Sequence, residues 1–317
     1  MNEDTKTLTA EALKKSKKKR IFRDNMTLFS MSLPALVCVI IFGYLPMVGI
    51  LIAFKDYVPR LGILGSKWVG LDNFKFIFQT QDLKRILRNT LAYSFWFLAV
   101  DTVMGPLYAL LMYHLKSRRA GKVYQTIMQL PRFFSIVIVS YITYAFLSPS
   151  YGIINQAITA LGGEAVEWYR EPGYWPLILT IVRQWMGIGA GFLIYYSTLL
   201  GVDEALFDAA TVDGANVWQK CWHVALPAMK PLICLNLIFG VGGVLGSNFG
   251  LHYNITQSSG FLFETTDVLG TYVYRGLMSG ELSRSTAVGL LTSVCGLILL
   301  LTTNAIVRKV SPENSLF

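Results

Sequence analysis

The segment MTLFSMSLPALVCVIIFGYLPMVGILIAF, residues 26–54, contains no charged side chain. A helix of about 20 apolar residues crosses the hydrocarbon core of a bilayer, so we expect a membrane span from Met26 to Phe54. The run is longer than the apolar part of a signal peptide, a charged tail precedes it, and no small-residue cleavage pattern follows it. We therefore expect this segment to be retained as the first span.

Five further segments meet the same criterion. Of the 317 residues, 53% are hydrophobic and only 15% are charged. The further predicted spans are Asn89–His114, Val123–Leu147, Tyr174–Leu200, Met229–Asn248 and Ser285–Val307. Six spans predict an all-α integral membrane protein, with one membrane domain over residues 26–310, a basic tail over 1–25 and a C-terminal tail over 311–317.

Lysine and arginine near the span ends mark the cytoplasmic side of a membrane protein. Counting the spans places three basic regions on one side of the membrane. They contain Lys14, Lys15, Lys17, Lys18, Lys19, Arg20, Arg23, Lys116, Arg118, Arg119, Lys122, Arg308 and Lys309. We therefore expect a multi-pass protein with both termini in the cytoplasm.

The basic run at 14–20 raises the alternative of a nucleic-acid-binding patch. Next to an apolar span, such charges more often orient the chain and contact anionic lipid, so lipid is an expected partner and nucleic acid is not. The four cysteines and three histidines are scattered, without the spacing of metal ligands. We expect neither a metal site nor a disulfide.

The sequence contains no G-x-x-x-x-G-K-[ST] loop, the motif that holds nucleotide phosphates. If ATP drives transport, another subunit binds it, and this chain is expected to bind no cofactor. No catalytic arrangement stands out either, so we do not expect an enzyme. The alternatives that remain are a stand-alone carrier of a small polar solute, driven by an ion gradient, and an assembly protein without a conduit.

Ion-coupled carriers usually place several ionisable groups in mid-membrane, and this chain offers chiefly Asp101, Arg132 and Arg183. Asp101 and Arg183 differ in depth by only about 5 Å at 1.5 Å per helical residue, so they are able to pair across the bundle. One interpretation is a structural ion pair. The other is that Arg183 faces the translocation path and holds a sugar hydroxyl or a carboxylate.

The cytoplasmic loop at 201–228 carries four acids and a single lysine, against the trend of the other cytoplasmic segments. Asp203 is a helix N-cap residue and alanines follow, so we expect a helix from Asp203 to Val212. Asp213-Gly214 predicts a turn, Asn216 can cap a second helix through Trp218 to Val224, and Leu226-Pro227 is expected to end it. This helix-turn-helix either packs on its own bundle or docks another protein.

The loop resembles the EAA loop of ABC importer permeases, whose pattern is E-A-A, then D-G-A, then a hydrophobic helix ending in L-P. The matching residues are Asp208, Ala209, Ala210, Asp213, Gly214, Ala215, Leu226 and Pro227. The family usually has Glu where this chain has Asp208, which keeps the charge but shortens the side chain by one methylene.

Other segments resemble the carbohydrate-importer (maltose-type) permeases, above all the group that handles oligosaccharides and polysaccharide fragments, including uronate-containing ones. These are YLPMVGILIAFKDY, VGLDNF, LSPSYGIIN, DVLGTYVYRGL and STAVGLLTSVCGLILLLTTN, in the family's order.

The resemblance implies a permease core in a bacterial cell membrane with a coupling helix at the loop between spans 4 and 5. It also implies a second, homologous permease, two copies of an ATPase that carry ATP and Mg, an extracytoplasmic solute-binding protein, and a carbohydrate substrate. In the permeases that the chain resembles, the spans before and after the loop touch the substrate, which implies Arg183, Gln184, Ser247 and Asn248 as path residues. Tyr141 and Tyr144 are further candidates, because aromatic faces stack on sugars. Hydrogen bonding between helices or ordinary packing is the alternative for each of these residues.

Overall fold

The computed structural model describes residues 25–26, 29–79, 81–115, 117–246 and 248–310. Residues 1–24 of the predicted basic tail and the C-terminal tail 311–317 lie outside the described residues. Within the described residues, five helices are long and apolar enough to cross a membrane, and a bent pair of helices makes a sixth span if it is counted as one. The predicted all-α membrane fold is confirmed.

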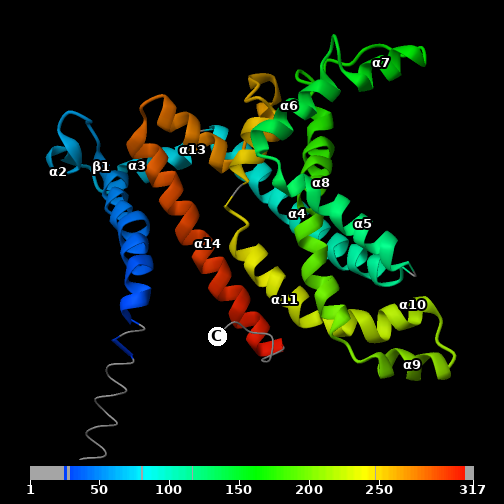
Figure 1. The fold of residues 1–317 in the computed structure, drawn as a ribbon. Helices are drawn as coiled ribbons and strands as arrows, with labels where there is room; N and C mark the ends of the chain where they lie inside the picture. The colour runs from blue at the N-terminus through cyan, green and yellow to red at the C-terminus, as the bar shows by residue number, and fades with distance from the viewer. Residues whose placement is uncertain (1–24, 27–28, 80, 116, 247, 311–317) are drawn as a thin grey trace, which may run out of the picture.

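The elements follow one another in Figure 1 from blue to red. They are η1 (Ile40–Tyr44), η2 (Leu45–Phe54), β1 (Lys55–Asp56), α2 (Gly62–Gly65), β2 (Lys67–Trp68), α3 (Asp72–Gln79), α4 (Gln81–Tyr113), α5 (Arg118–Gln129), η3 (Leu130–Phe133), α6 (Ile136–Leu147), α7 (Ile153–Ala160), η4 (Pro172–Tyr174), α8 (Trp175–Leu200), α9 (Glu204–Val212), α10 (Val217–Lys220), η5 (Cys221–Ala225), α11 (Leu226–Gly242), η6 (Leu251–Ile255), η7 (Gly260–Leu262), α12 (Phe263–Thr266), α13 (Leu269–Met278) and α14 (Leu282–Val310). Figure 1 places α9 and α10 at one end of the molecule and α2, α3 and α13 at the other.

Helix α4 begins at Gln81, before the start at Asn89 that the hydropathy of the sequence predicts. Its first turns carry charges on one side, where Arg85 lies 3.0 Å from Asp82. Leu83 and Ile86 on the other side are buried in a core cluster with residues of α13 and α14. The extension is amphipathic, so a criterion based on a continuous apolar run misses it.

The prediction of a single third span over Val123–Leu147 is wrong in shape. The chain bends by 101° between the helical segments Arg119–Phe133 and Ile136–Leu147. Pro131 has no N–H to continue the helical ladder. Ser135 then adopts an extended backbone, and its hydroxyl accepts a hydrogen bond from the Ile138 N–H at 3.3 Å, which starts a new helix.

The predicted break at Leu226-Pro227 is also wrong, because one helix runs from Val217 to Gly242. The turn before the proline, Cys221–Ala225, is π-helical, and the Leu226 N–H bonds to the carbonyl of Cys221. This wider turn shifts the hydrogen-bond register just before Pro227, so the missing donor is accommodated without a break.

Helix α11 ends at Gly242, six residues before the predicted end of the fifth span at Asn248. Glycine at 242, 243 and 246 removes the side chains that favour a continued helix. The predicted path residue Ser247 lies outside the described residues.

Helices α4 and α8 form the centre of the fold and make more contacts with each other than any other pair of described elements. At one end, Tyr93 and Phe97 of α4 and Leu179 of α8 belong to one buried cluster. At the other end, Ala109 of α4 and Leu199 of α8 belong to a second cluster, with residues of η5 and α11. The stretches between the two clusters are where a cavity forms.

Gly189 allows the backbone of α8 to touch the end of α5. A Cβ added there would lie 2.5 Å from the carbonyl oxygen of Met128 and 2.6 Å from the Cα of Gln129. We predict that Gly189→Ala lowers the free energy of unfolding by about 1–3 kcal/mol, the usual cost of overpacking. Thermal unfolding in detergent, followed by tryptophan fluorescence, measures the change.

Gly187→Ala on the same helix is the matched control, because an added Cβ there meets no atom within 4 Å. It is expected to be neutral, or stabilising by up to about 1 kcal/mol. Equal destabilisation by the two substitutions would show that the contact with α5 is not what constrains Gly189.

Candidate functional site

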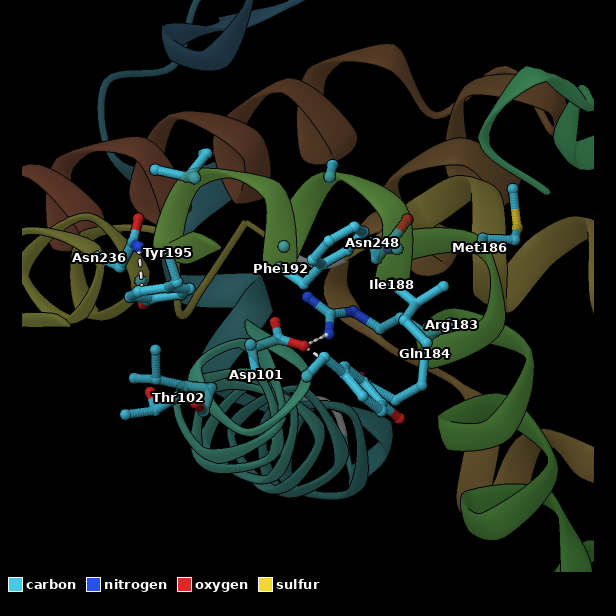
Figure 2. A pocket seen from close by; sticks show the side chains of 18 of the residues that line it. Asp101, Thr102, Arg183, Gln184, Met186, Ile188, Phe192, Tyr195, Asn236 and Asn248 are labelled. Carbon is cyan, nitrogen blue, oxygen red and sulfur yellow. Dashed lines mark hydrogen bonds and ion pairs between the residues drawn. The ribbon is translucent and has the colours of Figure 1, made fainter. Parts of the chain in front are cut away.

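A cavity of about 700 Å³ lies between the two core clusters, lined by α4, α8, α11 and the segment 248–251. Its polar lining residues are Asp101, Thr102 and Tyr108 of α4, Arg183, Gln184 and Tyr195 of α8, Asn236 of α11, and Asn248. Figure 2 shows Arg183 and Gln184 turned toward Asp101, and Asn236 turned toward Tyr195. Carboxylate, guanidinium, amide and phenol groups supply both donors and acceptors, which suits a hydroxyl-rich solute.

The central contact joins Asp101 to two neighbouring residues of α8. Nη1 of Arg183 and Nε2 of Gln184 each donate to Oδ1 of Asp101 at 2.6 Å. The guanidinium of Arg183 also lies over the ring of Phe97, 4.6 Å from its centroid. The structure thus contains the ion pair that the sequence left as one of two interpretations, and the two charges neutralise each other at the cavity wall.

Small residues of α8 leave room for this cavity. Gly187, Ala190 and Gly191 line it, and a Cβ added at Gly187 or Gly191 would meet open space. On α4, Gly105 lets the ring of Tyr195 approach to 2.7 Å from where a Cβ would stand. The glycines thus fix how closely the two helices meet and how much space remains between them.

Tyr195 and Asn236 form a second polar pair in the cavity, which the sequence analysis did not identify. Nδ2 of Asn236 donates to the hydroxyl of Tyr195 at 2.8 Å, joining α11 to α8. The available signal was an amide in the middle of an otherwise apolar span, since such residues usually pair or face a cavity.

The predicted path residues divide into two groups. Arg183, Gln184 and Asn248 line the cavity. Tyr141 on α6 is 70% exposed, and Tyr144 packs on Tyr169 with ring centroids 5.5 Å apart. Neither of these tyrosines lines the cavity, and a role for them in sugar recognition stays a prediction.

His252 lies buried behind Asn248, outside the spans. Its Nδ1 is 3.1 Å from the Asn248 carbonyl oxygen, and the ring centroids of His252 and Tyr93 lie 4.7 Å apart in a T-shaped arrangement. Burial, and secondarily the positive charge of Arg183, lower the pKa of His252 to about 4. The imidazole is therefore neutral at neutral pH and adds no second positive charge beside Arg183.

Helices α9 and α10 form the helix-turn-helix that the sequence predicts. The Asp203 carboxylate accepts from the Ala205 N–H at 3.0 Å, and Gly214 has φ +78°. Asn216 and Gln219 exchange side-chain and backbone hydrogen bonds of 2.8 and 2.9 Å. A further bond of 2.7 Å, from Lys220 Nζ to the Thr211 hydroxyl, ties the two helices together.

This helix-turn-helix exposes apolar side chains rather than burying them. Val212 is 88% exposed, Trp218 81% and Trp222 70%. Asp208 lies exposed on the same unit. An apolar surface around an acid is typical of a docking site for another protein.

A buried ion cluster on the opposite side of the molecule was also missed by the sequence analysis. The side chain of Asp267 is fully buried and accepts two bonds from Arg275, at 2.8 and 2.6 Å. Arg85 of α4 lies 3.7 Å away, and Thr271 donates to Asp267 at 2.7 Å. The cluster fixes α13 against the start of α4.

Known proteins match nearly the whole chain. The family described as binding-protein-dependent transport system inner membrane component matches residues 102–312. Protein LplB of Bacillus subtilis is 36% identical over 287 residues, 90% of each chain. The polygalacturonan/rhamnogalacturonan transport system permease protein YteP of the same organism is 36% identical over 314 residues, covering 96% of this chain and 95% of the relative.

A solved structure shares the fold. It is a bacterial alginate ABC transporter in complex with an alginate pentasaccharide-bound periplasmic protein. One of its chains matches with a TM-score of 0.83 and 33% identity, over 92% of this chain and 97% of that one.

The pair of Asp101 and Arg183 should show energetic coupling. Asp101→Asn and Arg183→Gln each leave one charge without its partner, so we expect the double variant to be more stable than the sum of the single effects predicts. Both side chains are partly exposed, so the coupling is expected at about 1 kcal/mol. Thermal unfolding of the four proteins in detergent measures it.

The exposed pair Asp72 and Lys75, 2.8 Å apart, is the matched control, with expected coupling of about 0–0.5 kcal/mol. Additive effects at Asp101 and Arg183 would mean that their contact contributes nothing to the fold.

Proposed function

This chain belongs to the family of binding-protein-dependent transport system inner membrane components, and on that premise we propose that it is a permease subunit of an ATP-driven importer of oligosaccharides or polysaccharide fragments. The observation that carries the proposal is the polar cavity between α4 and α8. Helix α8, which supplies Arg183 and Gln184, continues after a short connection into the exposed unit α9–α10. The solute site and the docking unit therefore share one helix.

The proposed complex contains a second, homologous permease, two copies of an ATPase and an extracytoplasmic solute-binding protein. ATP and Mg belong to the ATPase, and this chain holds no cofactor. The orientation by positive charge puts both termini and α9–α10 in the cytoplasm of the bacterial cell. The periplasmic protein in the related alginate transporter complex supports the binding-protein partner.

The coupling proposed here runs through the core cluster that contains Ala109 of α4 and Leu199 of α8. Phe207 of α9 packs on Tyr113 of α4, with ring centroids 5.3 Å apart. Beyond the turn, α10 continues through η5 into α11, which carries Asn236 in the cavity. A push on α9–α10 would thus move the inner ends of α8 and α11 together, and both helices line the cavity.

Acidic sugars are the proposed substrate class. One relative is named for polygalacturonan/rhamnogalacturonan transport, and a similar solved transporter is described as importing the acidic polysaccharide alginate. In this chain the charge of Arg183 is held by Asp101, so a sugar carboxylate would take the place of Asp101 at the guanidinium. The guanidinium carries five N–H donors, and its contact with Asp101 uses Nη1.

We predict that Arg183→Gln lowers kcat/KM for uptake of an acidic oligosaccharide by at least about tenfold, the effect of losing one charge-assisted contact. Uptake of a neutral oligosaccharide should change much less. The double variant Asp101→Asn/Arg183→Gln distinguishes loss of a sugar contact at Arg183 from repulsion of the acidic sugar by an unpaired Asp101, because it removes that repulsion. Acidic uptake that returns to normal in the double variant would show that Arg183 neutralises Asp101 and does not bind the sugar.

Asp208 is the proposed contact with the ATPase. We predict that Asp208→Lys abolishes ATP-driven uptake and substrate-stimulated ATP hydrolysis in proteoliposomes, since it reverses the charge at the docking unit. Glu204→Lys makes the same charge change on the same helix and is expected to keep most of the activity. Asp208→Glu, the residue usual in the family, should retain activity.

Reconstitution of the chain without its partners tests the alternative. Solute uptake driven by an imposed ion gradient, without any ATPase, would contradict the importer and support a stand-alone carrier. Normal uptake by Asp208→Lys would contradict the coupling role alone.

A further inference from the structure

A second cavity, of about 680 Å³, lies at the end of the molecule opposite α9 and α10. Three tyrosines line it, Tyr253 from η6 and Tyr272 and Tyr274 from α13. Ser258, Arg275 and Arg284 add polar groups. Its size is that of a small-molecule site, and rings beside hydroxyls are what sugar recognition requires.

The aromatic rings of this cavity are held in place by one another. Tyr253 and Tyr274 have ring centroids 4.8 Å apart. Phe249 packs against both, at 5.2 and 4.9 Å. Aromatic side chains that already pack against one another lose little conformational entropy when a ligand stacks on them.

The charged groups of the cavity are paired within the protein. Arg275 is bound to the buried Asp267, and the ring of Phe263 lies 4.2 Å from its guanidinium carbon. Arg284 lies 3.6 Å from Glu281, another lining residue. Arg275 binds its fully buried partner through two hydrogen bonds, whereas Arg183 binds the partly exposed Asp101 through one. A sugar carboxylate therefore displaces the partner of Arg275 less readily, and the lining favours the ring faces and hydroxyls of a sugar.

A strained turn brings Ser258 to the cavity. Gln257 has φ 52° and Ser258 has φ 51°, the left-handed region that non-glycine residues rarely adopt. The Ser258 N–H bonds to the Tyr253 carbonyl at 3.1 Å and closes the turn. Two consecutive strained residues next to a cavity are consistent with a functional constraint on this turn.

One short segment separates the two cavities. Asn248, Gly250 and Leu251 line the central cavity, whereas Tyr253 and Ser258 line the outer one. A ligand in the outer cavity therefore contacts the same segment that forms part of the central wall.

Resting on the importer function proposed above, we propose that the outer cavity is a second carbohydrate-binding site, which holds a sugar unit by stacking on Tyr253 and Tyr274 and by hydrogen bonds to its hydroxyls. The site takes neutral sugar units as well as the hydroxyl-bearing faces of acidic ones. It would receive one end of an oligosaccharide before the chain enters the central cavity.

Photoaffinity labelling of the intact transporter in lipid nanodiscs tests this site. The probe is an uncharged galactooligosaccharide that carries an aryl azide, and mass spectrometry locates the labelled residues. We expect label within residues 249–285 of the wild type, reduced at least about fivefold in Tyr253→Ala and in Tyr274→Ala. Tyr151→Ala, at an exposed tyrosine that lines neither cavity, is the control and should leave the labelling unchanged.

Ser258→Ala and Tyr274→Phe keep the turn and the ring, and each should reduce the labelling about twofold or more through a lost hydroxyl. They keep the test decisive if the alanine variants at the tyrosines fail to fold. No label within 249–285 of the wild type, or equal labelling in all folded variants, would overturn the second site. If the wild type imports the sugar with ATP in that case, the importer function stands; if no oligosaccharide is imported with ATP, the proposed function itself fails.

Discussion

The packing of α4 against α8 is the constraint on which the other features depend. In lipid there is little hydrophobic drive for helices to associate, so close packing and polar contacts must hold them. Gly105 admits the ring of Tyr195, and Gly189 admits the backbone of α5. With both ends of the helix pair closed by core clusters, the middle stays apart, and the contact of Asp101 with Arg183 bridges it.

This arrangement allows one ion pair to bridge two helices and still face a cavity. A fully buried pair would be inaccessible, and a fully exposed one would contribute little. Asp101 and Arg183 remain partly exposed at a cavity wall. Because the two charges neutralise each other, a carboxylate of the proposed substrate would bring one additional negative charge into the cavity and would compete with Asp101 for the guanidinium.

The features that sequence predicts well are local, and those it misses depend on distant partners. A continuous apolar run suffices to locate the first span, and the caps at Asp203 and Asn216 follow from neighbouring residues. The bend has local signals in Pro131 and in Ser135, which caps the next helix. The prediction of one span followed the overall hydropathy of Val123–Leu147 and did not use them. Asn236 pairs with Tyr195 and Asp267 lies near Arg85, partners that are far away in the chain. A local pattern therefore indicates at most the polar residue and not its partner.

The effect of the shorter side chain at Asp208 on docking depends on the residues that surround it. On the same helix-turn-helix, Val212 and Trp218 are largely exposed, and burial of such apolar area stabilises an interface at about 25 cal/mol per Å². A charge contact at a partly wet interface contributes about 1 kcal/mol or less. In the proposed complex, the apolar surface is therefore expected to supply most of the docking energy, while the acid fixes the orientation. One methylene less at Asp208 would then alter the distance to a basic group of the proposed ATPase partner without removing the apolar surface.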